Sequence, residues 1–248
     1  MKIICIIPAR MGSSRFPGKP MKKINGIPMI EQVYKNVKSC KLLNETIVAT
    51  CDKEIQDHIN KLGGIAIMTS TKHQRASDRC AEALEIIEKT KNTKYDIVVM
   101  VQGDEPMVHP QMIIESVQPL INDENVQITN LFGEIKSSEE FEDKNCVKVV
   151  CDKNLNAIYF SREPIPSFSK QKHRYMKKQI CVIPFRRDFL KQYLEMSPTI
   201  LEEIESVDMM RIIEHGFKVK MVPTKFETFA VDTEKDLKKV ENILKKKN

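Results

Sequence analysis

Hydrophobic and polar residues follow two alternating patterns along the first half of the chain. Continuous apolar runs, which are typical of buried strands, occupy residues 3–7, 46–52, 65–70 and 96–106. Between them, residues 28–40, 53–63 and 77–90 space their apolar side chains as amphipathic helices do. This alternation predicts an α/β fold with a mostly parallel sheet and helices on both faces. Because right-handed crossovers bring the carboxyl ends of parallel strands to one edge, we expect a ligand site at that edge.

The second half of the chain follows a different pattern. Residues 147–166 read as a β-hairpin that turns at 154–156, and residues 178–194 read as a strand passing into a helix. A helix is predicted over 200–216, a strand over 218–224 and a last helix from Thr233, its predicted N-cap. We therefore predict a single domain over residues 1–248, with an antiparallel arm or lobe from about residue 145 to 200.

Composition narrows the class of protein. The chain has 248 residues, of which 41% are hydrophobic and 30% are charged, as in globular proteins, and no stretch approaches the ~18 apolar residues of a membrane span. The seven cysteines are scattered without a CxxC pair, so we expect a cytoplasmic protein with neither a disulfide framework nor a zinc site. The net charge of +6 suits an anionic small ligand as well as a lysine-rich background, and no basic surface with interleaved aromatics indicates nucleic acid.

The loop after the first strand, "PARMGSSRFPGKP", carries a candidate phosphate site. It places Arg10, Arg15 and Lys19 among glycines and small hydroxyl residues, where backbone N–H groups can also turn toward an anion. The Arg15 guanidinium offers a fork of donors and the Lys19 ammonium a point charge for triphosphate oxygens. The loop matches neither GxGxxG nor GxxxxGK[ST], which disfavours a dinucleotide cofactor and a Walker A site. A solvated basic loop is the other interpretation.

Two carboxylates complete this candidate site. Asp104 follows a fully apolar strand in "VMVQGDEP", and Asp232 stands between an apolar run and a helix in "FAVDTEKDL". Carboxylate and phosphate oxygens are the ligands that Mg²⁺ prefers. Each residue could instead be a turn or cap aspartate. Taken with the cationic loop, they predict a metal–nucleotide site.

Five segments, in the same order and at comparable spacing, give the chain a family resemblance: "PARMGSSRFPGKP", "VQGDEP", "NCVKVV", "YFSREPIP" and "VDTEKDL". Over nearly its full length the chain resembles the 3-deoxy-manno-octulosonate cytidylyltransferases, the CMP-Kdo synthetases. The resemblance implies a Rossmann-like, GT-A-like nucleotidyltransferase fold with a mixed sheet, and a homodimer to which the arm contributes. It also implies transfer of CMP from CTP to a sugar acid with Mg²⁺ and release of pyrophosphate, in surface polysaccharide synthesis.

The resemblance assigns roles to individual positions. The implied catalytic residues are Arg15, Lys19, Asp104 and Asp232, of which the two aspartates hold the metal. The implied nucleotide-binding residues are Ala9, Arg10, Ser13, Arg15, Lys19, Ser77, Arg79 and Gln102. The implied substrate-binding residues are Gln102, Arg162, Gln179, Glu202, Glu205, Asp208 and Arg211.

Two segments depart from the family pattern. In "HQRASDR", Arg75 and Ala76 stand where the family has serine and glycine. In "QICVIPFR", Gln179, Ile183 and Pro184 stand where it has histidine, tyrosine and glycine. The nucleotide half is therefore intact and the sugar half more apolar, which leaves open whether Kdo or a modified octulosonate, nonulosonate or other acid is the acceptor, and whether Arg75 faces it.

Two classes of protein outside this family share some of these features. One is a nucleotide-binding regulator without catalysis, which the retention of both metal carboxylates disfavours because binding alone would not require them. The other is a GT-A glycosyltransferase, which the lack of a D-x-D signature at the strand end disfavours.

Overall fold

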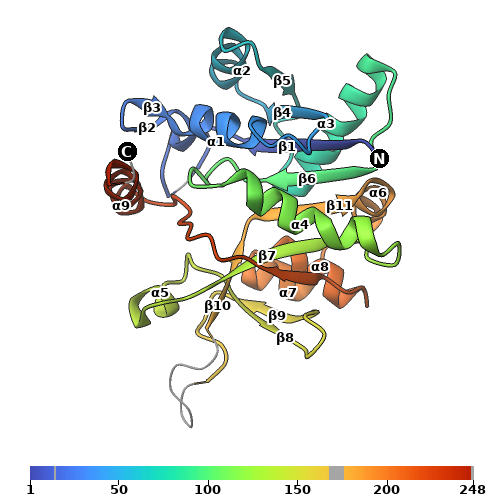
Figure 1. Ribbon diagram of the computed structural model, residues 1–248, viewed down its shortest axis with the longest axis vertical. Helices are drawn as coiled ribbons and strands as arrows, with labels where there is room; N and C mark the ends of the chain where they lie inside the picture. The colour runs from blue at the N-terminus through green and yellow to red at the C-terminus, as the bar shows by residue number, and fades with distance from the viewer. Residues whose placement is uncertain (14, 168–175, 247–248) are drawn as a thin grey trace. The chain divides into compact units, whose positions relative to one another are not determined.

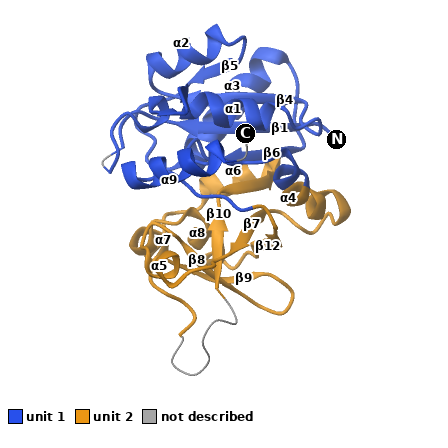
Figure 2. Ribbon diagram, turned by 60° about the vertical axis from the view of Figure 1, so that its left-hand side comes forward, with its two compact units in different colours: residues 1–114, 227–248 blue, residues 115–226 orange. Residues whose placement is uncertain are grey.

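The computed structural model describes residues 1–13, 15–167 and 176–246. The chain forms two compact units, residues 1–114 with 227–248 and residues 115–226, shown in blue and orange in Figure 2. The second unit takes in more of the chain than the lobe predicted over about 145–200. Among the described residues, no helix is both long and apolar enough to cross a bilayer.

The first unit is built on parallel strands. Its strand order is β6 (Ile97–Val101), β1 (Ile3–Ala9), β4 (Glu45–Thr50) and β5 (Ile65–Met68), and each neighbouring pair runs parallel. Every residue of β1 and β6 is buried, which explains their uninterrupted apolar sequences. The predicted parallel sheet is confirmed.

Helices cover this sheet on both faces, with α1 (Met29–Lys38) and α3 (Ala76–Lys91) on opposite sides of β1 and β4 (Figure 1). Helix α2 (Lys53–Lys61) packs on β4 and β5. Because the chain reaches β4 from β1 through α1 but returns from β5 to β6 through α3, the crossovers change direction beside β1. The carboxyl ends of β1 and β6 flank that switch point, where open α/β sheets bind ligands.

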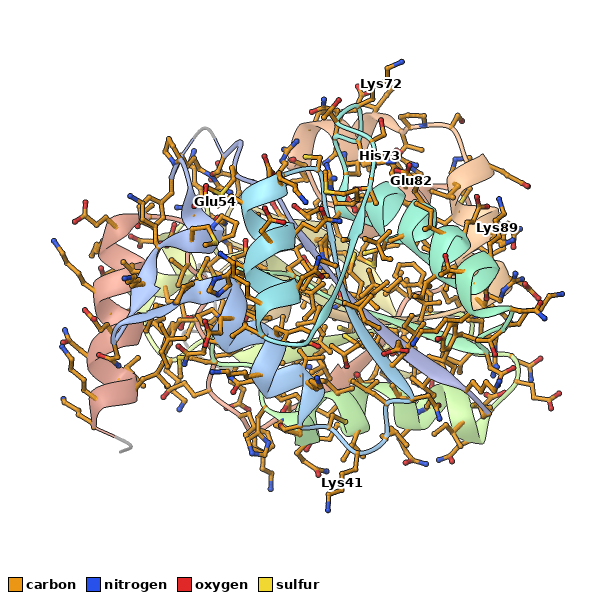
Figure 3. All side chains as sticks on the ribbon, turned by 90° about the horizontal axis from the view of Figure 1, so that it is seen from above. Lys41, Glu54, Lys72, His73, Glu82 and Lys89 are labelled. Carbon is orange, nitrogen blue, oxygen red and sulfur yellow. The ribbon has the colours of Figure 1, made fainter. Side chains whose placement is uncertain are left out.

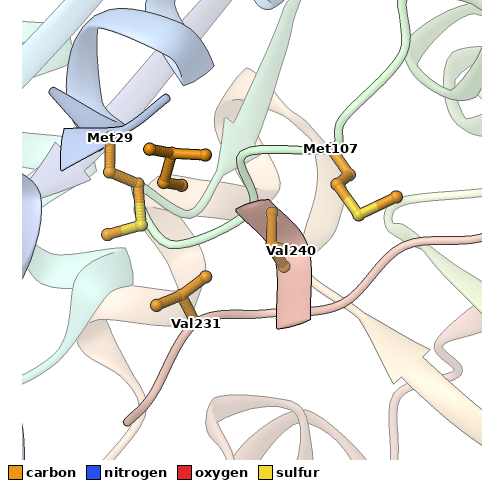
Figure 4. Packing of buried hydrophobic residues seen from close by; sticks show 5 residues of the cluster. Met29, Met107, Val231 and Val240 are labelled. Carbon is orange, nitrogen blue, oxygen red and sulfur yellow. The ribbon is translucent and has the colours of Figure 1, made fainter. Parts of the chain in front are cut away.

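The end of the chain returns to the first unit. Helix α9 (Glu234–Lys245) packs on the short strand β2 (Lys23–Ile24), which pairs with β3 (Ile27–Pro28). A buried cluster anchors it, comprising Ile24, Met29, Met107, Val231 and Val240 (Figure 4). Since Val231 directly precedes Asp232, this packing fixes the backbone that carries one of the predicted metal carboxylates.

The second unit holds a mixed sheet in the order β12 (Lys220–Pro223), β7 (Thr129–Glu134), β10 (Lys177–Ile180), β8 (Lys148–Cys151) and β9 (Ala157–Ser161). Strands β8 and β9 pair antiparallel, which confirms the predicted hairpin. The remaining elements are α4 (Pro110–Asn122), which spans the unit boundary, α5 (Ser138–Glu142), β11 (Val182–Arg186) and α6 (Arg187–Glu195).

The single helix predicted over 200–216 is wrong. The structure has two helices there, α7 (Ile200–Glu205) and α8 (Asp208–Glu214). Ser206 lies between them with φ of 52°, in the left-handed region, where the helical hydrogen-bond pattern cannot continue.

Candidate active site

A pocket of about 470 Å³ opens at the carboxyl ends of the first unit's strands. It is formed by the end of β1 and the loop after it, the start of α3 and the turn after β6. The structure therefore brings segments far apart in the sequence to the predicted edge of the sheet. The predicted site residues that line the pocket are Ala9, Arg10, Ser13, Arg15, Lys19, Arg79, Gln102 and Asp104.

Charged side chains meet at one point beside this pocket. The Lys19 ammonium donates to Asp104 Oδ2 at 2.7 Å and to Asp232 Oδ1 at 3.1 Å, and Arg15 Nη2 donates to the same Asp232 oxygen at 2.9 Å. The side chains of Lys19 and Asp232 are each 13% exposed and that of Asp104 is 18% exposed. Burial by itself would lower the pKa of Lys19, but Asp104 and Asp232 outweigh it and raise that pKa above its ordinary value. The predicted convergence of Lys19, Asp104 and Asp232 is thus present.

Hydrogen bonds to the carbonyl group of Met11 hold the cationic loop in its conformation. That oxygen accepts from Ser13 N at 2.8 Å and from Gly18 N at 3.1 Å, while Asp52 Oδ2 accepts from Met11 N at 2.8 Å. Gly18 has φ of 69°, which turns the chain into the short 3₁₀ helix η1 (Lys19–Met21). Asp52 therefore positions the loop, a role that sequence reasoning missed. Its place just after β4, at the same edge of the sheet, was the available signal.

The turn after β6 brings Asp104 against β1. A Cβ atom on Gly103 would lie 2.9 Å from the backbone oxygen of Pro8, so this approach requires glycine. The Asp104 carbonyl accepts from Val231 N at 3.0 Å, which ties the strand end to the segment that carries Asp232. Glu105, also carried on this turn, is 3% exposed and accepts from Thr228, so it braces the turn.

Asp232 does not cap the following helix. Thr233 is the N-cap of α9, as predicted, and its hydroxyl accepts from Asp236 N at 3.3 Å. The Asp232 carboxylate is thereby left to Lys19 and Arg15, which favours the site interpretation over the cap interpretation.

The start of α3 forms the opposite wall of the pocket. Arg79 is 3% exposed and donates from Nη1 to Thr69 Oγ1, whereas its buried Nη2 finds no hydrogen-bond partner among the described residues. Buried donors are almost always paired, so an unpaired one in a pocket wall fits a ligand oxygen or ring nitrogen. Arg75 lines the pocket too. Ser77, another predicted nucleotide-binding residue, is fully buried in the first turn of α3.

The loop before α3 is held by hydrogen bonds to Glu82. Glu82 on α3 accepts from His73 Nε2 and from Ser70 N at 2.8 Å, and Figure 3 shows His73 beside Glu82 at this end of the helix. Burial of Glu82 opposes ionisation, but Ser70 N and His73 outweigh it and lower the pKa of that carboxyl. His73 also lines the pocket, so Glu82 orients part of the pocket wall.

In the second unit, Glu202 and Arg211 bind each other. The Arg211 guanidinium donates from Nε and Nη2 to the two Glu202 oxygens, both at 2.7 Å. The two side chains are 6% and 0% exposed, with Arg211 stacked 4.6 Å from the ring centre of Tyr193. The structure thus shows Glu202 and Arg211 as a buried ion pair, and their substrate contacts remain a prediction.

Glu205 and Arg162 also have internal partners. The Glu205 carboxylate accepts from Tyr159, from Ser161 and from Arg162 N, at 3.0, 3.0 and 2.8 Å. The Arg162 guanidinium donates to the carbonyl oxygens of Glu205, Lys144 and Ser206. These contacts join β9 to the turn between α7 and α8, so both side chains have a structural role.

The remaining predicted substrate residues, Gln179 and Asp208, are both half-buried. Gln179 donates to Asn130 Oδ1 at 2.6 Å, and Asp208 is half-buried in the first turn of α8. Ile183, one of the departures from the family pattern, is 2% exposed on β11. A core position explains an apolar residue there without any change of substrate.

No group of three or more histidine, cysteine, aspartate or glutamate side chains within the described residues is arranged to hold a metal. The pair of Asp104 and Asp232 nevertheless fits a magnesium ion, because both carboxylates already face a single cation, the Lys19 ammonium.

Comparison with known proteins agrees with this geometry. Residues 4–228 match the family model described as cytidylyltransferase. The chain is 40% identical to a 3-deoxy-manno-octulosonate cytidylyltransferase of Geobacter metallireducens, over 97% of this chain and 96% of that protein. It is 41% identical to the Fusobacterium nucleatum protein of the same name, over 100% and 99% of the two chains.

Solved structures confirm the predicted fold. A CMP:2-keto-3-deoxy-manno-octonic acid synthetase complexed with CTP superimposes with a TM-score of 0.89 at 32% identity, covering 100% of both chains. A 4-diphosphocytidyl-2C-methyl-D-erythritol synthase from Anaerococcus prevotii shares the fold at 15% identity, with a TM-score of 0.65 and 98% of both chains covered. This chain belongs to the cytidylyltransferase family.

Proposed function

We propose that this protein transfers CMP from CTP to a hydroxyl, the anomeric one, of a Kdo-like 2-keto sugar acid and releases pyrophosphate. The observation that carries the proposal is the cluster of Arg15, Lys19, Asp104 and Asp232 beside a pocket at the sheet's switch point. The proposal is also supported by sequence identity, because the chain is about 40% identical, over almost its whole length, to enzymes named for this reaction.

Each part of the pocket has a role in this reaction. Arg15 and Lys19 would bind the triphosphate and neutralise the charge that grows on the leaving pyrophosphate. The unpaired Nη2 of Arg79 would donate a hydrogen bond to an oxygen or ring nitrogen of the nucleoside, which Gln102 just after β6 would also contact. Asp104 and Asp232 would hold Mg²⁺, which when bound supplies Lewis-acid stabilisation of the reacting phosphate. No side-chain nucleophile is needed, because the acceptor hydroxyl attacks the α-phosphorus directly.

The identity of the acid is the finer part of the proposal. The names of the relatives favour Kdo, and the burial of Ile183 removes one of the reasons to expect a modified acceptor. Arg75 in the pocket wall is the remaining departure that could meet an additional anionic group. Comparing kcat/KM for Kdo with that for its amino-substituted and phosphorylated analogues at fixed CTP tests this. Kdo as the best acceptor supports the proposal, and a large preference for an analogue contradicts it.

We also propose a cytoplasmic homodimer. All seven cysteines are free thiols, which suits a reducing compartment. Ile200 and Ile204, one turn apart on α7, are 73% and 69% exposed, an apolar face that a second copy would cover. Sedimentation velocity should show a dimer that the double variant Ile200→Asp, Ile204→Asp converts to monomers. A monomeric wild-type protein would contradict this part of the proposal.

The catalytic proposal is tested by Asp104→Asn, with Asp57→Asn as the matched control because Asp57 is an exposed carboxylate on α2. Pyrophosphate release from CTP, Mg²⁺ and sugar acid should fall by about a hundredfold or more in the first variant, equivalent to roughly 2.7 kcal/mol of barrier. The control should match wild type. Turnover of Asp104→Asn within about tenfold of wild type contradicts the role of this carboxylate. Wild-type protein that binds CTP but turns over no acid would favour the non-catalytic alternative.

A further inference from the structure

Lys19 stands where the proposed metal would have to bind. Its ammonium nitrogen is 2.7 Å from Asp104 Oδ2 and 3.1 Å from Asp232 Oδ1, so both carboxylates are turned toward one cation. Mg²⁺ bonds to oxygen at about 2.0–2.1 Å. A metal ion bound to both carboxylate oxygens would therefore occupy the space that the Lys19 ammonium fills, so the two cations cannot be there together.

The positive and negative charges of this cluster are equal in number. Lys19 and Arg15 oppose Asp104 and Asp232, and three of the four side chains are less than a fifth exposed. Charges in so sheltered a site interact more strongly than on an open surface. A divalent cation that enters alone would have to displace Lys19, and the ammonium would lose both partners.

A metal–triphosphate complex changes this balance. It brings its own phosphate oxygens, which offer new acceptors to the displaced ammonium and to the Arg15 guanidinium. The four-carbon stem of Lys19 lets the ammonium move between carboxylate and phosphate while its backbone stays in η1, just after Gly18. Every charge then has a partner again.

We propose that Lys19 is an internal counter-ion that holds the carboxylate pair closed to free divalent metal and gives it up only when metal and triphosphate arrive together. This inference rests on the proposed function, because it takes Asp104 and Asp232 as metal ligands. Its physical content is a coupling between two ligands: nucleotide raises the affinity for metal, and metal raises the affinity for nucleotide by the same factor.

The test measures Mn²⁺ binding in the absence of nucleotide, by calorimetry and by the electron paramagnetic resonance of free Mn²⁺. Lys19→Met should bind Mn²⁺ at least about tenfold more tightly than wild type, although it removes a residue of the proposed active site. The matched control is Lys22→Met, which removes an ammonium that lies over the Phe16 ring and should leave Mn²⁺ affinity unchanged. The double variant Lys19→Met, Asp104→Asn should lose the gain, which places the bound ion on the carboxylate pair.

A second measurement follows the coupling itself. A non-hydrolysable CTP analogue should raise the Mn²⁺ affinity of wild type by a larger factor than that of Lys19→Met. Lys19→Gln, whose polar side chain keeps more of the native packing, should behave as Lys19→Met does, and thermal melts identify any variant that fails to fold. Equal Mn²⁺ affinities of wild type and both Lys19 variants would overturn the inference. Because Mn²⁺ binding needs no turnover, absence of pyrophosphate release would count against the proposed function and leave this result standing.

Discussion

Replacing Glu202 by glutamine should destabilise the protein strongly. The Glu202 carboxylate is fully buried and receives two hydrogen bonds of 2.7 Å from the Arg211 guanidinium, whose side chain is 6% exposed. Glutamine keeps the size of the side chain but removes the charge and offers one acceptor oxygen in place of two. The guanidinium then remains buried over the Tyr193 ring without its counter-charge.

The magnitude follows from the degree of burial. Breaking a buried ion pair by removing one partner costs about 3–5 kcal/mol, because the remaining charge stays buried without its counter-charge. With a urea dependence of roughly 2 kcal/mol per molar, the unfolding midpoint should fall by about 2 M. Far-UV circular dichroism is the natural probe, since the chain has no tryptophan. The double variant Glu202→Leu, Arg211→Met should be more stable than Glu202→Gln, because no unpaired charge is left.

The same variant decides between a structural role and a substrate role. A structural role predicts that Glu202→Gln, assayed in conditions where it is folded, keeps the KM for the sugar acid close to that of wild type. A midpoint within about 0.5 M of the wild-type value, which is roughly 1 kcal/mol, combined with a raised KM would refute the reasoning and restore the role that the family resemblance implies.

Three further predictions concern other features of the structure. Gly103→Ala should lower stability by about 1–3 kcal/mol and reduce turnover, because the new methyl group would lie 2.9 Å from the Pro8 carbonyl oxygen; thermal melts and pyrophosphate release measure both effects. Burial raises the pKa of the Cys146 thiol to about 12, so at pH 8 iodoacetamide should label it about a thousandfold more slowly than in urea, and comparable rates would contradict that burial. A hydrogen bond from Lys35 lowers the pKa of Glu31, so the pair stabilises the fold above about pH 4.3, the unfolded value, and stops doing so as pH falls through the folded pKa. Glu31→Gln should therefore be about 0.5–1 kcal/mol less stable than wild type at pH 7 and equal to it near pH 2, as urea titrations at the two pH values will show.

The first unit could be predicted from the sequence because its strands are buried on both sides. An uninterrupted apolar run such as Ile3–Ile7 has few structural interpretations, and the alternation with helices fixes the direction of the strands. From that direction alone, the polar residues just after β1 and β6 must share an edge. The contact of Lys19 with Asp104 is the observed form of this expectation. Asp52 follows β4 at this same edge, so its contact with the loop after β1 could have been predicted in the same way.

The second unit was harder to predict for a physical reason. In "LEEIESVDMMR" the charged residues keep helical spacing whether they face a ligand or one another, so periodicity cannot separate the two cases. The left-handed turn at Ser206 breaks that segment, although serine has no strong preference for such a conformation. The break allows α8 to return against α7, and only this tertiary packing brings Arg211 to Glu202. The sequence alone therefore shows that Glu202 and Arg211 are charged, but it does not predict that they pair with each other.

The contrast between Arg79 and Arg211 shows what a structure adds to such patterns. Both are arginines on helices, and both are almost completely buried, at 3% and 5% exposure. The charged nitrogens of Arg211 that face Glu202 are paired with carboxylate oxygens at short distance, so the residue stabilises its own unit. Arg79 has one nitrogen on Thr69 and another, Nη2, for which the described residues supply no acceptor, at the wall of a pocket. A buried donor of this kind costs stability until a ligand satisfies it. The incomplete hydrogen bonding of Arg79, rather than its charge or burial, is therefore the observation that supports the binding role proposed for it.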